Sequence, residues 1–275
     1  MKRKKLYGKN VFVTGASSGI GRACARMFAG NGYNVTGVSR NTEECVEEFP
    51  GGGTLTLMRL DVTEETAVRK FVEDLPGVDI AILCAGMGVA GPAETTSSEL
   101  TRKQMEVNYF GTLNAAQPCL TKMRRQRKGL LLVIGSIAGR VSIPMQSQYS
   151  ASKYALEAFT DAVRMEMKPY GVRACIIEPG DTRTGFTAAR EMQSAEDNNY
   201  SGVLEKSVSK MAADEQNGRS PDSVAKIALK LAGRKHPPAR VPVGLEYKAL
   251  MQLLRIMPDR GKEFILSKLY LPKNE

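Results

Sequence analysis

Thr14-Gly15-Ala16-Ser17-Ser18-Gly19-Ile20-Gly21 is the stretch that decides the fold. It follows the β-rich run of residues 10–14, and residues 20–30 then carry apolar or small side chains at helical spacing. This order predicts a strand, a tight turn and a helix. The three glycines let the backbone approach a phosphate at the helix N-terminus, where amides and the dipole favour anions. The spacing is G-x-x-x-G-x-G, and taken alone it is also compatible with a plain turn.

Strand-like runs near residues 10, 34, 54, 78, 130, 172 and 240 alternate with helical segments along the chain. This alternation predicts an α/β fold, a Rossmann-like, doubly wound parallel sheet of about seven strands with helices on both faces. The 275 residues, 42% of them hydrophobic, are enough for one full core. We therefore expect residues 1–275 to form a single domain.

A second motif, Tyr149-Ser150-Ala151-Ser152-Lys153, places a tyrosine and a lysine one turn apart on one helix face. Tyrosine is a poor acid or base at neutral pH, but a nearby ammonium stabilises the phenolate and lowers its pKa. Ser136, at the end of an apolar run, offers a hydroxyl to hold a substrate oxygen while Tyr149 exchanges a proton. This is the proton exchange that interconverts a carbonyl and an alcohol, and a cofactor would carry the hydride.

The ordered set of motifs resembles the short-chain dehydrogenase/reductase family over roughly residues 9–184. The matching positions are Thr14 to Gly21, Asn108, Ser136, Tyr149, Lys153 and Pro179-Gly180. The resemblance implies that Tyr149 is the general acid/base, that Lys153 lowers its pKa and holds the nicotinamide ribose, and that Ser136 polarises the substrate oxygen. It also implies that Asn108 helps to maintain a water-linked proton relay.

One position departs from the family. Leu83-Cys84-Ala85-Gly86 stands where the family usually has Asn-Asn-Ala-Gly, so the usual asparagine bond to the central sheet is absent. We expect Cys84 to be a small buried residue. The departure leaves open which group supplies the local hydrogen bonds.

The resemblance also implies which residues bind the cofactor. These are Gly15, Ser17, Ser18, Gly19, Ile20, Gly21, Ser39, Arg40, Asp61, Val62, Ala85, Gly86, Tyr149, Lys153, Pro179, Gly180, Thr182 and Thr184. Ser39 and Arg40 follow the second strand, at the position where an acidic residue would bind the ribose 2′-hydroxyl of NAD. A cation beside a small hydroxyl suits a 2′-phosphate, so we expect NADP(H). The alternative is that Arg40 is a solvated loop residue.

Charge and cysteine content narrow the classes of function. The five cysteines form no C-x-x-C pair, and the single histidine, His236, has no visible partners, so we expect neither a metal site nor a catalytic triad. The net charge of +10 includes five cations within residues 122–128, but no nucleic-acid module accompanies them, and we expect no nucleic-acid partner. No apolar run reaches the ~18 residues of a membrane span and no signal peptide is visible, which predicts a cytoplasmic protein.

Substrate contacts are expected beyond Pro179-Gly180, because ligands of open α/β sheets bind outside the carboxyl ends of the strands. Residues 181–218 suit a substrate lid, although their apolar side chains would equally pack only on the domain. Candidate pocket walls are Met87, Val89, Ile137, Val141, Ile143 and Met145. A largely apolar pocket is implied.

Residues 245–271 are basic and amphipathic, and Pro258 divides them into two predicted helices. This extension is similar to the tail of hydroxysteroid- and retinol-dehydrogenase-like members, which implies a lipophilic substrate. It would otherwise cover the sheet edge or contact a second subunit, and peripheral contact with a membrane surface is a weaker alternative.

We therefore expect an NADP(H)-dependent oxidoreductase that interconverts a carbonyl and an alcohol on a steroid-, retinoid- or acyl-chain-like substrate. One alternative is a reductase of a carrier-bound 3-oxoacyl thioester with the same catalytic residues. Another is a non-catalytic NADP(H)-sensing or scaffold protein on the same fold. The resemblance further implies a homodimer or homotetramer, built through helices predicted at residues 101–127 and 147–170.

Overall fold

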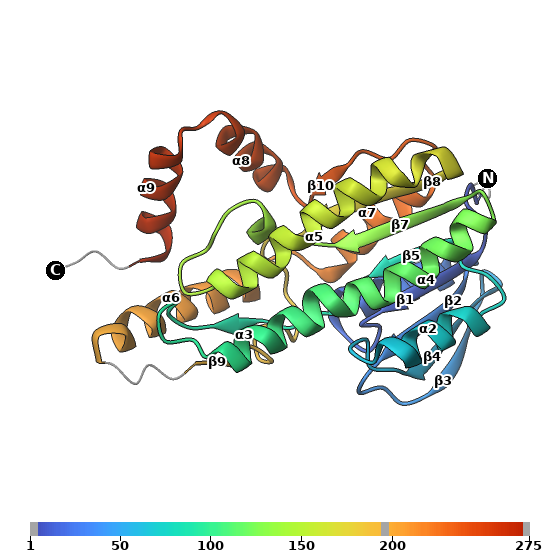
Figure 1. Ribbon diagram of the computed structural model, residues 1–275, viewed down its shortest axis with the longest axis horizontal. Coiled ribbons are helices and arrows are strands. Elements are labelled where there is room, and N and C mark those ends of the chain that lie inside the picture. Colours follow the sequence, from blue (N-terminus) through green and yellow to red (C-terminus); the bar gives the residue numbers. More distant parts are fainter. Residues whose placement is uncertain (1–4, 194–197, 272–275) are drawn as a thin grey trace.

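The computed structural model describes residues 5–193 and 198–271, and its centre is an eight-stranded sheet in the order β10-β8-β7-β5-β1-β2-β4-β3 (Figure 1). All neighbouring strands are parallel except β3, which pairs antiparallel with β4. The strands of this sheet are β1 (Asn10–Thr14), β2 (Asn34–Ser39), β3 (Cys45–Phe49), β4 (Gly53–Arg59), β5 (Ile80–Leu83), β7 (Gly129–Ile134), β8 (Val172–Glu178) and β10 (Arg240–Pro242). A separate short sheet pairs β6 (Val89–Ala90) with β9 (Glu191–Met192).

The central strands are apolar along their whole length because helices cover both faces of the sheet. β5 reads Ile-Ala-Ile-Leu and β7 reads Gly-Leu-Leu-Leu-Val-Ile, and every residue in both is buried. Parallel strands that are buried on both faces show such continuous runs instead of an alternating pattern. The predicted doubly wound α/β fold is confirmed.

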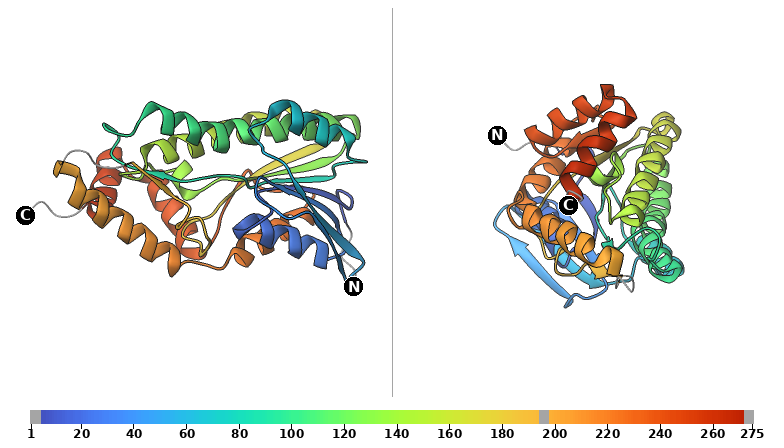
Figure 2. Two further views of the ribbon diagram at one scale, coloured as in Figure 1. Left: turned by 90° about the horizontal axis from the view of Figure 1, so that it is seen from below. Right: turned by 90° about the vertical axis from the view of Figure 1, so that its left-hand side faces the viewer.

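Helices form one layer on each face of the sheet (Figure 2). α1 and α7 lie on one face and share a buried core with the sheet, whereas α2, α4 and α5 cover the other face. The helices are α1 (Gly19–Gly30), α2 (Glu65–Asp74), α3 (Ser98–Met105), α4 (Gly111–Arg125), α5 (Ser147–Glu166), α6 (Asn198–Gln216), α7 (Pro221–Ala232), α8 (Leu245–Ile256) and α9 (Asp259–Tyr270). None of the helices within the described ranges is long and apolar enough to cross a bilayer.

The edge strand β3 is an eighth strand that the sequence pattern does not predict. Its residues are exposed or only half-buried, and Val46 is 66% exposed, so no hydrophobic periodicity marks the strand. It pairs with β4 through a tight turn in which Gly52 has a φ of +74°, a conformation that favours glycine. The pairing covers the backbone of β4, which would otherwise be the edge of the sheet.

The strand order places a binding edge at the carboxyl ends of β1 and β5. From β1 the chain builds outward through β2 and β4, and it then returns to the other side of β1 to add β5, β7, β8 and β10. Loops therefore diverge between β1 and β5, which is where ligands of such sheets bind.

The C-terminal segment forms the two helices predicted from Pro258. α8 and α9 lie beyond the carboxyl ends of the strands, near α6 (Figure 1). Pro258 is the N-cap of α9, in an extended conformation that separates the two helices. The helices predicted near residues 101–127 and 147–170 are also present, and a π-helical turn, Glu106–Phe110, interrupts the first of them.

Candidate active site

A cavity of about 540 Å³ opens at the carboxyl edge of the sheet. Every residue that the sequence predicts as a cofactor contact lines it, together with Ser136. Of the predicted site residues only Asn108 is outside the lining, directly behind it. The fold thus brings together motifs that are up to 169 residues apart, from Gly15 to Thr184.

The glycine turn leaves the N-terminus of α1 open to this cavity. Gly15 and Gly19 have φ angles of +69° and +54°. A Cβ on Gly21 would lie 2.1 Å from the carbonyl oxygen of Gly15, so only glycine lets the helix start this close to β1. The N-cap Ser18 makes no side-chain capping bond, and the first turn holds no acidic residue. Amides of this turn are therefore available to an anion such as a pyrophosphate.

The end of β2 carries a small hydroxyl and a cation. The hydroxyls of Ser17 and Ser39 lie 2.9 Å apart in a hydrogen bond. The exposed Arg40 side chain places Nε 3.8 Å from Asp61 Oδ2, so Arg40 leans toward the predicted adenine contact. This loose pair leaves the guanidinium within reach of a phosphate on the ribose.

Tyr149 and Lys153 project from the first turns of α5, and Ser136 follows β7. The Nζ of Lys153 lies 5.7 Å from the centre of the Tyr149 ring and donates a hydrogen bond to the Ile134 carbonyl at 3.2 Å. The Oγ of Ser136 accepts a bond from the Ala138 amide at 3.1 Å, which orients the hydroxyl beside the cavity. The helix α5 and the segment after β7 thus present a phenol, an ammonium and a hydroxyl to one space.

Burial has the largest effect on the pKa values of Tyr149 and Lys153. It raises the pKa of Tyr149 to about 12, although a hydrogen bond with Ser136 acts in the opposite direction. Burial also lowers the pKa of Lys153 to about 8, against the opposing effects of Cys84 and Glu157. Because burial raises this pKa, where the sequence motif predicts a lowered one, Tyr149 holds its proton at neutral pH and is able to donate it.

Asn108 lies within the π-helical turn and is fully buried. Its Oδ1 accepts from the amide of Met87 at 2.8 Å, and its Nδ2 donates to the Met87 carbonyl and to Ser152 Oγ at 3.1 and 3.0 Å. These bonds join the loop after β5 to α5. The π-helical turn, a feature frequent at functional sites, lets one side chain serve both elements.

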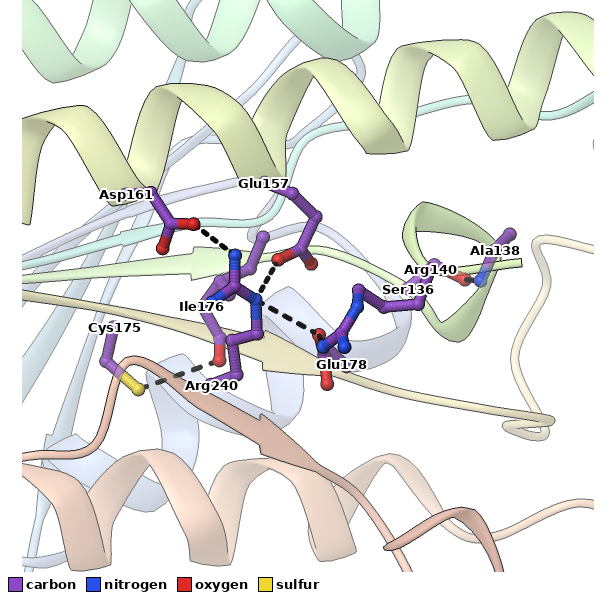
Figure 3. A network of polar contacts seen from close by, with 9 residues as sticks. All are labelled: Ser136, Ala138, Arg140, Glu157, Asp161, Cys175, Ile176, Glu178 and Arg240. Carbon is purple, nitrogen blue, oxygen red and sulfur yellow. Dashed lines mark hydrogen bonds and ion pairs between the residues drawn. The ribbon is translucent and has the colours of Figure 1, made fainter. Parts of the chain in front are cut away.

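An ionic network around the buried carboxylates of Glu157 and Glu178 supports the site from behind (Figure 3). Arg240 of β10 bonds Glu157 Oε2 at 2.7 Å and also bonds Asp161, and its Nε lies 3.9 Å from Glu178 Oε1. Arg140 approaches the same Glu178 oxygen at 3.2 Å. Burial, and next the neighbouring Glu178, raise the pKa of Glu157 well above its usual range. The network ties α5 to β8, which ends at Glu178, and spacing along the sequence gives no signal for it.

The far end of the cavity is apolar and comes from segments that follow β8. Its lining includes Phe186, Tyr247, Leu250, Leu254, Ile265, Leu266, Leu269 and Tyr270. The ring of Phe186 packs on Tyr149 with centroids 5.7 Å apart. Glu215 of α6 also lines the cavity and pairs with the buried Arg190. Sequence reasoning placed residues 245–271 in amphipathic helices but did not identify their leucines as cavity walls.

The predicted pocket walls divide into two groups. Met87, Ile137, Val141 and Ile143 line the cavity. Val89 and Met145 are not among the lining residues, because Val89 pairs with β9 in the short sheet and the Met145 carbonyl accepts a bond from Gly91. Four of the six predicted wall residues therefore line the cavity.

Comparison with known proteins identifies the family. The model of the short chain dehydrogenase family matches residues 9–195, which contain the glycine turn, Ser136, Tyr149 and Lys153. The chain belongs to the short-chain dehydrogenase/reductase family. It is 34% identical to the 3-ketodihydrosphingosine reductase of Bacteroides thetaiotaomicron, over 96% of this chain and 93% of that protein.

Solved structures of other short-chain dehydrogenases share the fold. One from Streptomyces avermitilis superposes with a TM-score of 0.80 at 25% identity and covers 95% of both chains. Another, from Burkholderia cenocepacia in complex with NADP, has a TM-score of 0.74 at 23% identity and covers 98% of this chain and 100% of that one. The chain is thus a short-chain oxidoreductase that acts on CH–OH and C=O groups, and an NAD(P) cofactor is typical of its family.

The departure from the short-chain dehydrogenase pattern at Cys84 is accommodated by Thr14. The Oγ1 of Thr14 accepts bonds from the amides of Cys84 and Ala85 at 3.0 and 3.1 Å, which joins the end of β1 to the loop after β5. Cys84 lines the cavity, and burial raises the pKa of its thiol to about 12. Cys84 is therefore a neutral thiol on the cavity wall, and only partly buried rather than enclosed as expected.

Proposed function

We propose that this enzyme is an NADP(H)-dependent reductase of a ketone on a long-chain lipid. The observation that carries the proposal is the shape of the lining: one cavity runs from the hydroxyls of Ser136 and Tyr149 to the leucines of α8 and α9. Such a wall would bury an alkyl chain at ~0.8 kcal/mol per methylene group. The relationship to a 3-ketodihydrosphingosine reductase supports a long-chain ketone over a steroid or a retinoid.

The proposed roles follow from the side chains. The Tyr149 hydroxyl donates its proton to the carbonyl oxygen as Ser136 donates a hydrogen bond to the same oxygen. When bound, the nicotinamide supplies the hydride for the carbonyl carbon. Lys153 holds the nicotinamide ribose, and Asn108 fixes the loop at Met87 and the N-terminal part of α5. The raised pKa of Tyr149 favours reduction, because the proton is in place before the reaction.

The proposed preference for NADP(H) rests on Ser39 and Arg40. The free amides of the first turn of α1 suit the pyrophosphate, and Gly15, Gly19 and Gly21 keep that surface clear. A ribose 2′-phosphate would take the guanidinium of Arg40, and Ser39 offers a hydroxyl where a carboxylate would repel the phosphate.

We propose that residues 181–193 and 198–218 of the predicted lid cover the substrate, since they contribute Phe186 and Glu215 to the cavity. Residues 194–197 of the predicted lid lie outside the described residues. We also propose a homodimer or homotetramer through the face of α4 and α5, where Phe110, Tyr154 and Met165 are exposed. Sedimentation velocity tests the assembly. A monomer at working concentration would remove it from the proposal.

The test of function is NADPH oxidation with 3-ketodihydrosphingosine, a steroid ketone, retinal and a 3-oxoacyl thioester. Tyr149→Phe should lower kcat by about 10²- to 10⁴-fold and leave NADPH binding unchanged, because the ring stays and only the proton donor is lost. Tyr170→Phe is the matched control, since Tyr170 is outside the cavity lining.

Turnover confined to the thioester would replace the proposed substrate with a carrier-bound one. Equal turnover by Tyr149→Phe and the wild type would contradict the proposed proton donor. NADPH binding without turnover of any ketone would favour a sensing or scaffold protein.

A further inference from the structure

The helices α8 and α9 are apolar on two sides. One side packs against the domain, where Met251 and Leu254 are buried with Ile137 and Val141. The same side contributes Leu250 and Leu254 to the cavity. The exposed apolar residues on the other side of α8 are not part of this buried cluster.

The other side of the two helices exposes large apolar side chains to solvent. On α8 these are Leu245, Leu253 and Ile256, with Leu245 78% and Ile256 81% exposed. Their spacing of eight and three residues places them on one stripe of the helix. On α9, Phe264 is 68% exposed. A helix that is apolar on both sides is unexpected in water, and a patch of this kind marks an interaction surface.

Cations surround these apolar residues. Lys248, Arg255, Arg260 and Lys268 are exposed and form no ion pair within the described residues. Phe264 lies one turn from Arg260 and one turn from Lys268, so a cation flanks the ring on each side along α9.

The acidic residues of this segment do not balance those cations. Glu246 pairs with Arg219, and Asp259 pairs with Lys262. Glu263 is the one exposed carboxylate of α8 and α9 that no ion pair of the described residues occupies. The surface made by the exposed side chains of α8 and α9 is therefore apolar with a net positive rim, which is the pattern of helices that lie on anionic lipid.

The cavity reaches this surface through α9. Ile265, Leu266 and Leu269 line the cavity, yet Leu269 is also 47% exposed. The neighbouring Phe264 points to solvent on the same helix. Leu269 therefore joins the cavity to the exposed side of α9, at the end of the molecule where α6, α8 and α9 lie (Figure 2).

We propose that the exposed side of α8 and α9 docks on an anionic lipid bilayer, so that a lipid passes from the membrane into the cavity. The passage of substrate rests on the proposed function, whereas the docking does not. A second copy of the chain fits this surface less well, because a two-fold contact would bring the unpaired cations of both copies together.

The experiment is sedimentation of the full chain with vesicles, without substrate or cofactor. Vesicles of phosphatidylcholine with phosphatidylglycerol should retain the chain, whereas phosphatidylcholine alone or high salt should weaken retention. The double variant Ile256→Ser, Phe264→Ser should bind at least tenfold more weakly, because each substitution removes a side chain that would enter the lipid. Val46→Ser is the matched control, because Val46 is an exposed aliphatic residue on β3.

Three outcomes would overturn the proposal. The first is a chain that stays in solution with both kinds of vesicle, and the second is equal binding by the double variant and the control. The third is a dimer that the double variant dissociates, which would assign the surface to a second copy. Turnover of a detergent-dispersed lipid ketone separates the two proposals: the double variant should retain it, and its absence in the wild type would count against the proposed function alone.

Discussion

The two ends of the cavity recognise their ligands by different means. At the cofactor end, the backbone of the glycine turn and the N-terminus of α1 provide the surface, and single atoms decide the fit, as at Gly21. At the substrate end, the leucines of α8 and α9 provide an apolar wall that is partly exposed. The cofactor end thus requires particular backbone positions, whereas the substrate end requires only that the side chains of its wall are apolar.

This difference explains why one end carries a motif and the other does not. A backbone that must approach a phosphate admits only glycine at certain positions, so the sequence is constrained residue by residue. An apolar wall accepts any hydrophobic side chain of suitable volume. Substitutions at the cofactor end should therefore have large effects, and substitutions at the substrate end should have small and additive ones.

Of the variants considered, Gly21→Ala should weaken cofactor binding most strongly. The new Cβ would lie 2.1 Å from the Gly15 carbonyl oxygen, and because that oxygen belongs to the backbone the turn has to shift. We expect NADPH affinity to fall about a hundredfold or more in a fluorescence titration. Gly30→Ala on the same helix is the control, because its Cβ would make an ordinary contact at 3.7 Å with Phe49. Equal affinities of the two variants would show that the turn tolerates a side chain.

Arg40→Gln tests whether the cofactor end of the cavity distinguishes NADPH from NADH. Loss of a charge-assisted bond to the 2′-phosphate should weaken NADPH binding about ten- to a hundredfold and leave NADH binding unchanged. The effect should shrink at high salt because the side chain is exposed. Parallel losses for both cofactors would instead assign Arg40 to the loop structure around Asp61.

Leu269→Ala should have a smaller effect, confined to substrate binding at the apolar end of the cavity. This side chain lines the cavity, and its truncation should raise KM for a long-chain ketone about five- to tenfold without changing NADPH affinity. Leu253→Ala is the matched control, since Leu253 is equally exposed at 47% but lies outside the cavity lining. The comparison uses detergent-dispersed substrate. A rise in KM for a short, soluble ketone would contradict a wall that binds only the alkyl chain.

Glu157→Gln tests the ionic network behind the cavity through the pH dependence of stability, not through ligand binding. The folded-state pKa of Glu157 is raised to about 8, chiefly by burial and by Glu178. Its protonated form therefore favours folding, a contribution that is complete below the unfolded pKa and is lost as the pH rises through the folded one. Between about pH 5 and pH 8 the free energy of unfolding of the wild type should fall relative to the variant, by at most ~1.4 kcal/mol per pH unit.

Urea unfolding at several pH values measures this difference, and Glu166→Gln is the control because Glu166 is exposed at the end of the same helix. The network that surrounds Glu157 also contains Asp161, Arg240 and the Lys153 ammonium. A wild type and a Glu157→Gln variant with parallel profiles would mean that Glu157 is ionised in the folded protein.

Local patterns predicted much of this molecule. The strand before Gly15, the buried runs of β5 and β7, and the break at Pro258 are all confirmed, because each follows from neighbouring residues. The edge strand β3 was missed because its exposed side chains leave no periodicity. The predicted catalytic and cofactor-binding residues remain predictions, although the fold brings all of them to one cavity or, for Asn108, directly behind it.

By itself the sequence determined the α/β fold, the glycine turn and the helical Tyr149–Lys153 pair, because fixed spacing along one strand or helix is enough to specify them. Only the tertiary structure decided that Glu157, Glu178 and Arg240 form one buried network, and that the leucines of α8 and α9 close a cavity that begins at Ser136. These contacts join segments far apart in the chain, and their geometry depends on how whole elements pack. Packing of that kind leaves no local signature in the order of the residues.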